Sequence, residues 1–470
     1  MKKRAVIYGI VFSVTLPGMS LSAGLTKSEI FFRCYSQLTD RRLPANDRRI
    51  SNIKLGTLDP IIACMDLLKS AEFGLDGQIP NPTDPTKYEA KLVLRRMHKL
   101  HTSFFLLEDY NENGRPLTRD MYDIETAAYY FTRALFQAHS DFTSVVTATK
   151  HLRAIRSIQS PPTGSAFGVA REKVAFGDKE VYTPRGELWG IQEIDTLPLG
   201  ESNTNPPASL DLATHFGGGI IGSNPYLYAV QARNEAIVSN GGLRMHRGFS
   251  KAIMNDFLCR EFPVVEERDV VQFVTPASSL AFRQSKSCNQ CHASMDQLAS
   301  VLRNMSYIGY QAKTLPTHVQ PGFETAYFLR KFNTTDPVVS GWPAEPNNRH
   351  HVTPTTGRLF YRDSSNRLVD QPIDSLTSLG LALRDQFDFY LCTASRYYAH
   401  FTGVKIKIVP GLIGTSGPNN RLVNQAQYPH VKNIHDLAKT LQSKKSIPVL
   451  IESILKLPEY QKSDFGVSGP

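Results

Sequence analysis

The 470-residue chain lacks the features that mark several common classes of protein. Beyond residue 23, no apolar run is long enough to cross a bilayer as a helix, so no integral membrane segment is expected in the mature chain. The formal net charge is +10, but no long basic run carries interleaved aromatic residues, and nucleic-acid binding is not predicted. No repeat, Ser-His-Asp signature, zinc-binding helix motif or carboxylate pair stands out. The sequence therefore gives no support for a hydrolase.

Cysteine is scarce, with six residues in the chain, and two of them lie in one short motif. The stretch Cys288-Asn289-Gln290-Cys291-His292 has the pattern C-x-x-C-H, the attachment sequence for a c-type haem. The two thiols would add to the haem vinyl groups, and His292 would be the proximal ligand of the iron. A redox-active thiol pair and half of a zinc site are the alternatives. Both are weaker, because the chain has no second C-x-x-C and no βαβ pattern around this one.

The N-terminus predicts export. Residues 1–23 comprise a basic start, an apolar run interrupted by Pro17-Gly18, and small residues suited to cleavage before residue 24. This is the organisation of a secretory signal peptide. We therefore expect a periplasmic or secreted protein, which agrees with covalent haem attachment outside the cytoplasm.

The other four cysteines are numerous enough for two disulfides, as expected in an oxidising compartment. They are Cys34, Cys64, Cys259 and Cys392. Four cysteines allow three pairings, which sequence alone does not distinguish. We favour Cys34–Cys64, since both lie on neighbouring predicted helices, which leaves Cys259–Cys392. The alternative is four free, buried thiols.

Apolar residues at helical spacing predict a mainly α fold, a multi-helix assembly with irregular loops and short strands in the middle. The predicted helices cover residues 28–38, a segment starting at Pro60 with Asp59 as its N-cap, 87–107, 118–155, 243–258, 293–307, 375–401 and 433–455. Short strands are expected near 181–182 and over 188–194, and the glycines at 217–219 and 222 predict a linker or a packed turn rather than a phosphate loop. The predicted segments are a signal peptide (1–23), an N-terminal helical domain (24–158), a Pro/Gly-rich irregular segment (159–242), a cytochrome-c-like haem region (243–312) and a C-terminal loop and helical domain (313–470).

Residues on both sides of the motif form a longer pattern. It runs through His246-Arg247-Gly248, Phe257-Leu258-Cys259, Pro263, Cys288 to Ala293, Met295-Asp296, Leu298, Leu302, Asn304 and Ile308-Gly309, and later through Cys392, Tyr398 and Gly403. In order and spacing it resembles the planctomycete-type secreted cytochrome-c-like proteins of unknown function, although Met305-Ser306 stands where that family has Phe-Asp. The resemblance implies an exported haem protein and implies no substrate.

The ligand on the other side of the iron is left open by the sequence. No methionine follows Met305, so a distant downstream methionine is not available. The candidates are His318, His350, His351, Met245, His246 and Met254. For each of them a surface histidine or a core methionine is the plainer interpretation. An open distal position is a further alternative.

Three functions follow from these alternatives. The first is one-electron transfer in the cell envelope through haem c, with a redox partner protein that the basic surface would help to attract. The second is an open-iron haem enzyme or small-ligand sensor. The third is a haem-free structural or interaction protein in which Cys288 and Cys291 form a disulfide.

Overall fold

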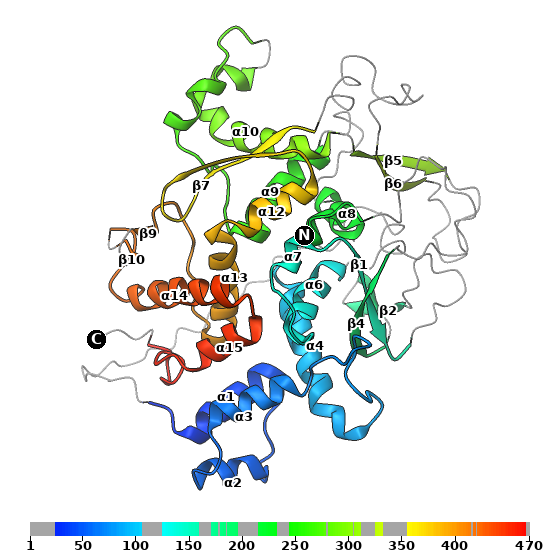
Figure 1. Cartoon of the computed structure of the whole chain (residues 1–470), viewed down its shortest axis with the longest axis vertical. Helices are drawn as coiled ribbons and strands as arrows, with labels where there is room; N and C mark the ends of the chain where they lie inside the picture. The colour runs from blue at the N-terminus through cyan, green and yellow to red at the C-terminus, as the bar shows by residue number, and fades with distance from the viewer. Residues whose placement is uncertain are drawn as a thin grey trace, which may run out of the picture.

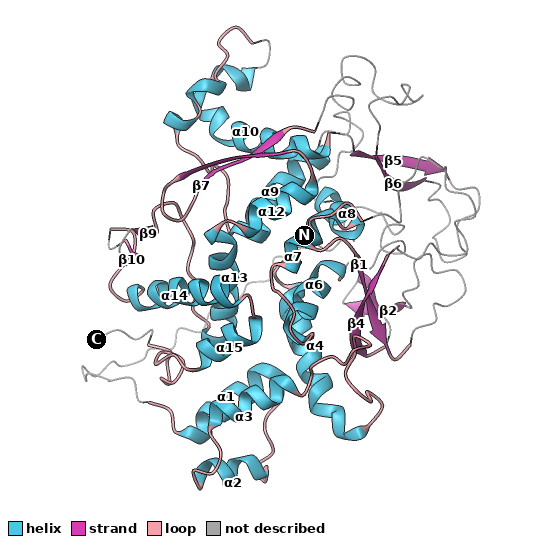
Figure 2. Cartoon of the chain, viewed as in Figure 1, coloured by secondary structure: helices cyan, strands magenta, loops and turns pink. Residues whose placement is uncertain are grey.

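The structure is a computed structural model of the whole chain. It describes residues 24–105, 125–158, 171–176, 179–184, 186–195, 215–232, 244–278, 281–303, 305–311, 325–331, 355–414, 417–419 and 421–466. Helices dominate this part of the chain, and the strands are short (Figure 2), so the mainly α prediction is confirmed. The cytochrome-c-like region and the segment bounds stay predictions. None of the described helices is both long and apolar enough to cross a bilayer.

The N-terminal helices form one end of the molecule (Figure 1). They are α1 (Lys27–Thr39), α2 (Arg48–Lys54), α3 (Pro60–Lys69), the 3-10 turn Pro85–Lys87 and α4 (Tyr88–Thr102). The start of α3 is as predicted: the Asp59 carboxylate accepts the Ile61 and Ile62 amides, and Pro60 takes the first helical position. In α1, Thr26 and Glu29 form a reciprocal capping box.

The middle of the chain combines short helices with antiparallel strand pairs. Its elements are α6 (Thr126–Phe136), α7 (Ser144–Thr147), β1 (His151–Arg156), β2 (Arg171–Phe176), β3 (Lys179–Pro184), β4 (Leu188–Ile194), the 3-10 turn Gly219–Gly222 and α8 (Asn224–Ala232). β1 pairs with β4, and β2 with β3. The strand prediction over 188–194 is confirmed.

The predicted helix over 118–155 is partly wrong. Residues 118–124 lie outside the described residues, α6 ends at Phe136, and 151–156 form strand β1. Backbone geometry explains the stop, because Gln137 is extended and His139 takes a left-handed conformation. Beyond that point, pairing with β4 buries Leu152 and Ile155, and such short apolar runs do not distinguish a strand from a helix.

The glycine-rich turn is packed, as predicted. Gly217, Gly218 and Gly219 all have positive φ angles, which favour glycine. A Cβ atom on Gly222 would lie 1.7 Å from the Gly217 carbonyl oxygen, so no side chain fits there. The turn lies against helix α7 and against helix α12 (Leu376–Arg384), which comes later in the chain.

The segment with the motif contains α9 (Arg244–Leu258), α10 (Lys286–Ala299), short 3-10 turns at Glu267–Asp269, Val271–Phe273, Ala281–Gln284 and Ser300–Leu302, and the pair β5 (Met305–Gln311) with β6 (Thr325–Lys331). α9 is as predicted. The predicted helix over 293–307 is wrong at both ends, since α10 starts before the motif and Met305 begins a strand. Pairing with β6 overrides the helical spacing there.

The C-terminal elements are β7 (Gly357–Arg362), β8 (Leu368–Ile373), α12, α13 (Phe387–Thr402), β9 (Ile413–Gly414), β10 (Gly417–Pro418), α14 (Tyr428–Lys444) and α15 (Ile447–Leu455). One helix is predicted over 375–401 and one over 433–455, but the structure has two helices in each of these segments. Gln386 is extended and separates α12 from α13. Lys445 is left-handed, and Ser446 caps α15, with Pro448 in its first turn.

Two disulfides join distant helices, and both have the favoured pairing. Cys34–Cys64 connects α1 to α3, and Cys259–Cys392 connects the end of α9 to α13. The buried apolar residues form one connected core that runs from Ile30 in α1 to Tyr460 after α15. Cys288 and Cys291 remain free thiols.

Candidate functional site

The C-x-x-C-H motif lies in the first two turns of α10, at the end of the molecule opposite α1–α3 (Figure 1). Ser285 is the extended residue before the helix, so Cys288 is the third helical residue. Cys288, Cys291 and His292 are at positions i, i+3 and i+4, which places them on one face of the helix. Cys288 is exposed, whereas Cys291 and His292 are partly buried. The helix thus presents two thiols and one imidazole together near the surface.

The His292 ring is held on two sides. Its Nδ1 lies 3.1 Å from Oδ2 of Asp296, one helical turn further along α10. The Phe282 ring stacks on the imidazole, with the ring centroids 4.2 Å apart. A carboxylate accepts hydrogen bonds and does not donate them, so Nδ1 carries the proton in the neutral ring and Nε2 carries the lone pair. Nε2 is then the nitrogen able to bind a metal.

Asp296 is in turn bound by Arg247 from α9. The Arg247 Nε and Nη2 atoms lie 2.8 and 3.3 Å from the two Asp296 carboxylate oxygens. The Arg247 guanidinium also lies 5.7 Å from the centre of the Phe282 ring. One turn further along α9, the Ser250 hydroxyl donates to the Met295 carbonyl at 2.8 Å. The contact between α9 and α10 therefore fixes the carboxylate that orients His292.

Cys291 is the less exposed of the two thiols of the motif. Burial, and then the neighbouring Cys288, raise the pKa of the Cys291 thiol. This shift is opposite to the depressed pKa by which nearby positive charge activates a reactive cysteine.

The candidates for the distal ligand are mostly outside this site. His318, His350 and His351 lie outside the described residues, as do the side chains of Met245 and His246. Met254 is fully buried in the core, which agrees with its interpretation as a core methionine. Within the described ranges, no group of three or more His, Cys, Asp or Glu side chains is arranged to hold a metal ion.

The sequence did not predict a polar network in the core between α4, α6 and α13. Thr132 Oγ1 lies 3.0 Å from Nδ1 of His98 and 2.9 Å from Nδ1 of His101, and it donates to the Ala128 carbonyl. Nε2 of His101 lies 2.6 Å from the Tyr397 hydroxyl. Burial lowers the pKa of His101 well below its usual value. The spacing of the two histidines on one face of α4 is the only signal of this network in the sequence.

The network continues to an ion pair. Oε2 of Glu125 lies 3.3 Å from Nε2 of His98 and 2.7 Å from Nη2 of Arg156 in β1. Burial raises the pKa of Glu125, but the hydrogen bond and charge of His98, followed by Arg156, outweigh it and lower the pKa. The network links three helices and a strand, which is a structural role.

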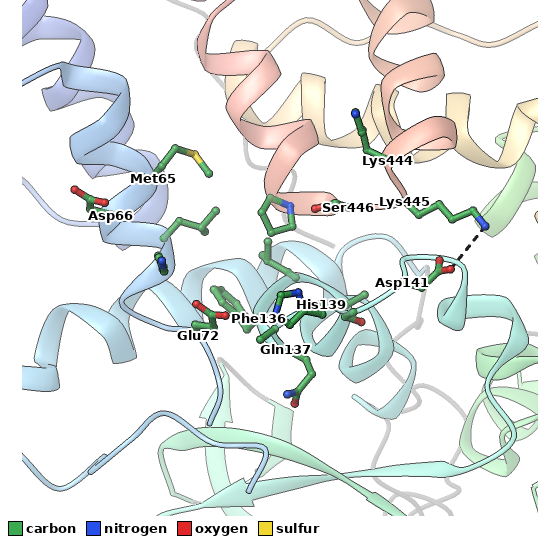
Figure 3. Close-up of a pocket in the computed structure, with 17 residues that line it drawn as sticks. Met65, Asp66, Glu72, Phe136, Gln137, His139, Asp141, Lys444, Lys445 and Ser446 are labelled. Carbon is green, nitrogen blue, oxygen red and sulfur yellow. Dashed lines mark ion pairs between the residues drawn. The ribbon is translucent and has the colours of Figure 1, made fainter. Parts of the chain in front are cut away.

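A cavity of about 630 Å³ lies where α3, the end of α6 and the α14–α15 turn meet (Figure 3). Its walls include apolar side chains such as Phe136 and charged ones of both signs. Asp141 and Lys445 form an ion pair across its edge at 3.8 Å. The cavity is away from α10 and contains no residue of the motif.

Comparisons with known proteins identify no relative of this chain. No family model, no curated protein and no solved structure matches it. The resemblance to secreted cytochrome-c-like proteins therefore stays a prediction from the sequence.

Proposed function

We propose that the protein is an exported c-type haem protein that transfers single electrons in the cell envelope. Haem would be attached through Cys288 and Cys291, and Nε2 of His292 would be the proximal ligand of its iron. The observation that carries the proposal is the partition of the cysteines. Four of the six pair with one another, and the remaining two are free thiols on the helix face that also holds His292.

The donor set fits haem c in two respects. Thioether formation needs two unpaired thiols within reach of the haem edge, and Cys288 is exposed. An iron-binding histidine usually donates its other N–H to a carboxylate or carbonyl, and Asp296 accepts from Nδ1 of His292. When bound, haem supplies one-electron chemistry, while these residues attach it and orient the imidazole.

The disulfides support the exported location. Disulfides persist in oxidising compartments and are rare in the cytosol. Two of them tie this fold together. The periplasmic or secreted location and the redox partner protein are parts of the same proposal, drawn from the N-terminal sequence and the basic charge.

Expression in a periplasm with haem-maturation proteins tests the proposal. Denatured protein separated on a gel should retain haem colour, and Cys291→Ala should lose most of it. Ser287→Ala, which changes an exposed neighbour in the same helical turn, is the matched control and should keep the colour. A wild-type mass equal to that of the bare polypeptide would contradict haem attachment.

Voltammetry then tests the electron-transfer role. A reversible one-electron wave is expected from the haem-loaded protein. Tight binding of carbon monoxide to the ferrous form, or rapid peroxide turnover, would instead favour the open-iron enzyme or sensor. A Cys288–Cys291 disulfide found by peptide mapping, with no haem, would favour the structural alternative.

A further inference from the structure

The surroundings of His292 contain more than an attachment motif requires. A carboxylate lies at Nδ1, an aromatic ring covers one face, and an arginine from another helix binds the carboxylate through two nitrogens. The side chains of His292, Asp296 and Arg247 are 24, 34 and 46 % exposed. Exposed pairs of this kind contribute little to stability, so stability alone does not account for the arrangement.

We propose that Asp296 and Arg247 are positioning residues that fix His292 in the tautomer with its proton on Nδ1 and its lone pair on Nε2. The proposal deepens the haem-binding function and rests on it for its electronic consequence. Asp296 sets the tautomer directly, because its oxygens only accept hydrogen bonds. Arg247 acts through Asp296, since its two hydrogen bonds hold the carboxylate within reach of Nδ1 of His292.

The pair also determines how strongly the imidazole donates electrons to the metal. A carboxylate that accepts a hydrogen bond from the Nδ1–H group makes the ring a more basic ligand. A more basic ligand stabilises ferric over ferrous iron and lowers the reduction potential. Arg247 moderates the effect, because its positive charge withdraws electron density from the carboxylate.

The first test needs no haem. Protein from a host without haem maturation, with Cys288 and Cys291 as free thiols and both disulfides intact, is examined by long-range proton–nitrogen NMR at about pH 8, where an ordinary histidine is neutral. His292→Gln identifies the His292 signal by its loss. Wild-type His292 should carry its proton on Nδ1, and Asp296→Ala should move it to Nε2. Asp296→Asn should keep it on Nδ1, since the amide oxygen still accepts.

The matched control is Asp370→Ala. Asp370 is 34 % exposed, like Asp296, and pairs with Arg358 across β7 and β8. This variant removes an equivalent ion pair and should leave the His292 tautomer unchanged. Wild-type protein with the proton on Nε2, or an Asp296→Ala spectrum equal to wild type, would overturn the proposal.

The second test uses the haem-loaded protein. The reduction potential should shift upward in Asp296→Ala and, by less, in Asp296→Asn, while Asp370→Ala should match wild type. Equal potentials in all four proteins would refute the electronic part while leaving haem binding intact. Absence of haem from the wild type would instead refute the proposed function, and the NMR result would still decide the positioning role.

Discussion

Arg260 and Asp388 form an ion pair that is almost completely excluded from water. Their side chains are 3 and 0 % exposed, and their closest atoms are 2.8 Å apart. The Ser364 amide also donates to Asp388. Arg260 follows Cys259, and Asp388 lies one turn before Cys392 on α13. The ion pair and the disulfide therefore reinforce the same contact.

Loss of the Asp388 charge should be costly. Asp388→Asn leaves the Arg260 guanidinium buried without a counter-charge, which we expect to lower the free energy of unfolding by about 3–5 kcal/mol. Urea unfolding of the oxidised protein measures the change. Asp436→Asn, which disrupts the exposed pair with Lys432, should cost far less, because water screens that pair. Similar losses for the two variants would contradict the importance of burial.

His215 should make stability depend on pH. Burial, and then the neighbouring His151, lower its pKa to about 3. The unfolded chain binds a proton near pH 6.5 and the folded protein does not, so stability is complete above that pH and falls as the pH decreases.

Between about pH 5.5 and 4, where the unfolded chain is protonated at this histidine and the folded protein is not, His215 should contribute a slope of about 1.4 kcal/mol per pH unit. His215→Asn keeps an acceptor for the Gly217 amide but does not titrate, so the slope should decrease by that amount. Unfolding curves at several pH values measure it. An unchanged slope in His215→Asn would count against the assignment.

At the scale of single residues, the sequence singled out Cys288, Cys291 and His292 but not the side chains that contact them. The spacing of His292 and Asp296 is already consistent with a contact on a helix. Arg247 lies 45 positions before His292 in the sequence, and only the packing of α9 on α10 brings it to Asp296. The buried network around Thr132 arises in the same way, from contacts between α4, α6 and α13.

The position of helix α12 depends on the absence of a side chain at Gly380. A Cβ atom on Gly380 would lie 2.0 Å from the Val146 carbonyl oxygen and 2.9 Å from the Cα atom of Gly218. The absence of a side chain lets α12 approach both α7 and the glycine-rich turn.

Gly380→Ala should therefore destabilise the protein, although alanine favours an exposed helix by about 1 kcal/mol. The overpacked contact should cost about 1–3 kcal/mol. Thermal unfolding measures the change. Ser378→Ala would not serve as a control, because Ser378 is part of the capping box at the start of α12. Gly403→Ala is the better control. Its added Cβ atom has no neighbour within 4 Å, so only the strain of the positive φ angle should lower the stability. An increase in stability for Gly380→Ala would contradict the close approach.

Among the elements, those with a strong local signal were predicted best. Asp59-Pro60 marks the start of α3, and the glycines at 217–219 mark a turn. The breaks at Gln386 and Lys445 were missed because the apolar spacing continues across them. β1 and β5 were missed because their pairing with distant strands, rather than their own composition, determines their conformation.

For the whole molecule, the two disulfides should contribute unequally. Cys259–Cys392 spans 133 residues and Cys34–Cys64 spans 30. On the chain-entropy account, the longer loop should contribute about 5 kcal/mol and the shorter about 3.5 kcal/mol. Unfolding of the double variants Cys259→Ala/Cys392→Ala and Cys34→Ala/Cys64→Ala tests the order. Non-reducing peptide mapping that finds another pairing would contradict both values.

The global arrangement was beyond the sequence. Composition and periodicity indicate a mainly helical protein, and the predicted export signal favours disulfides. The juxtaposition of α1 and the segment that follows α15 comes from no local pattern. The side chain of Arg33 in α1 contributes to it by donating to the carbonyl groups of Tyr460, Lys462 and Ser463.

That juxtaposition imposes an order on biosynthesis. Arg33 and Ser463 are 430 positions apart, so at roughly 5–20 residues per second the partner carbonyls emerge from the ribosome about 20–90 s after Arg33. The guanidinium also lies 4.0 Å from the centre of the Phe465 ring, which arrives equally late. Helix α1 is thus among the last of the described helices to complete its contacts, and until then its apolar face can pack only against earlier partners such as α3 and α4.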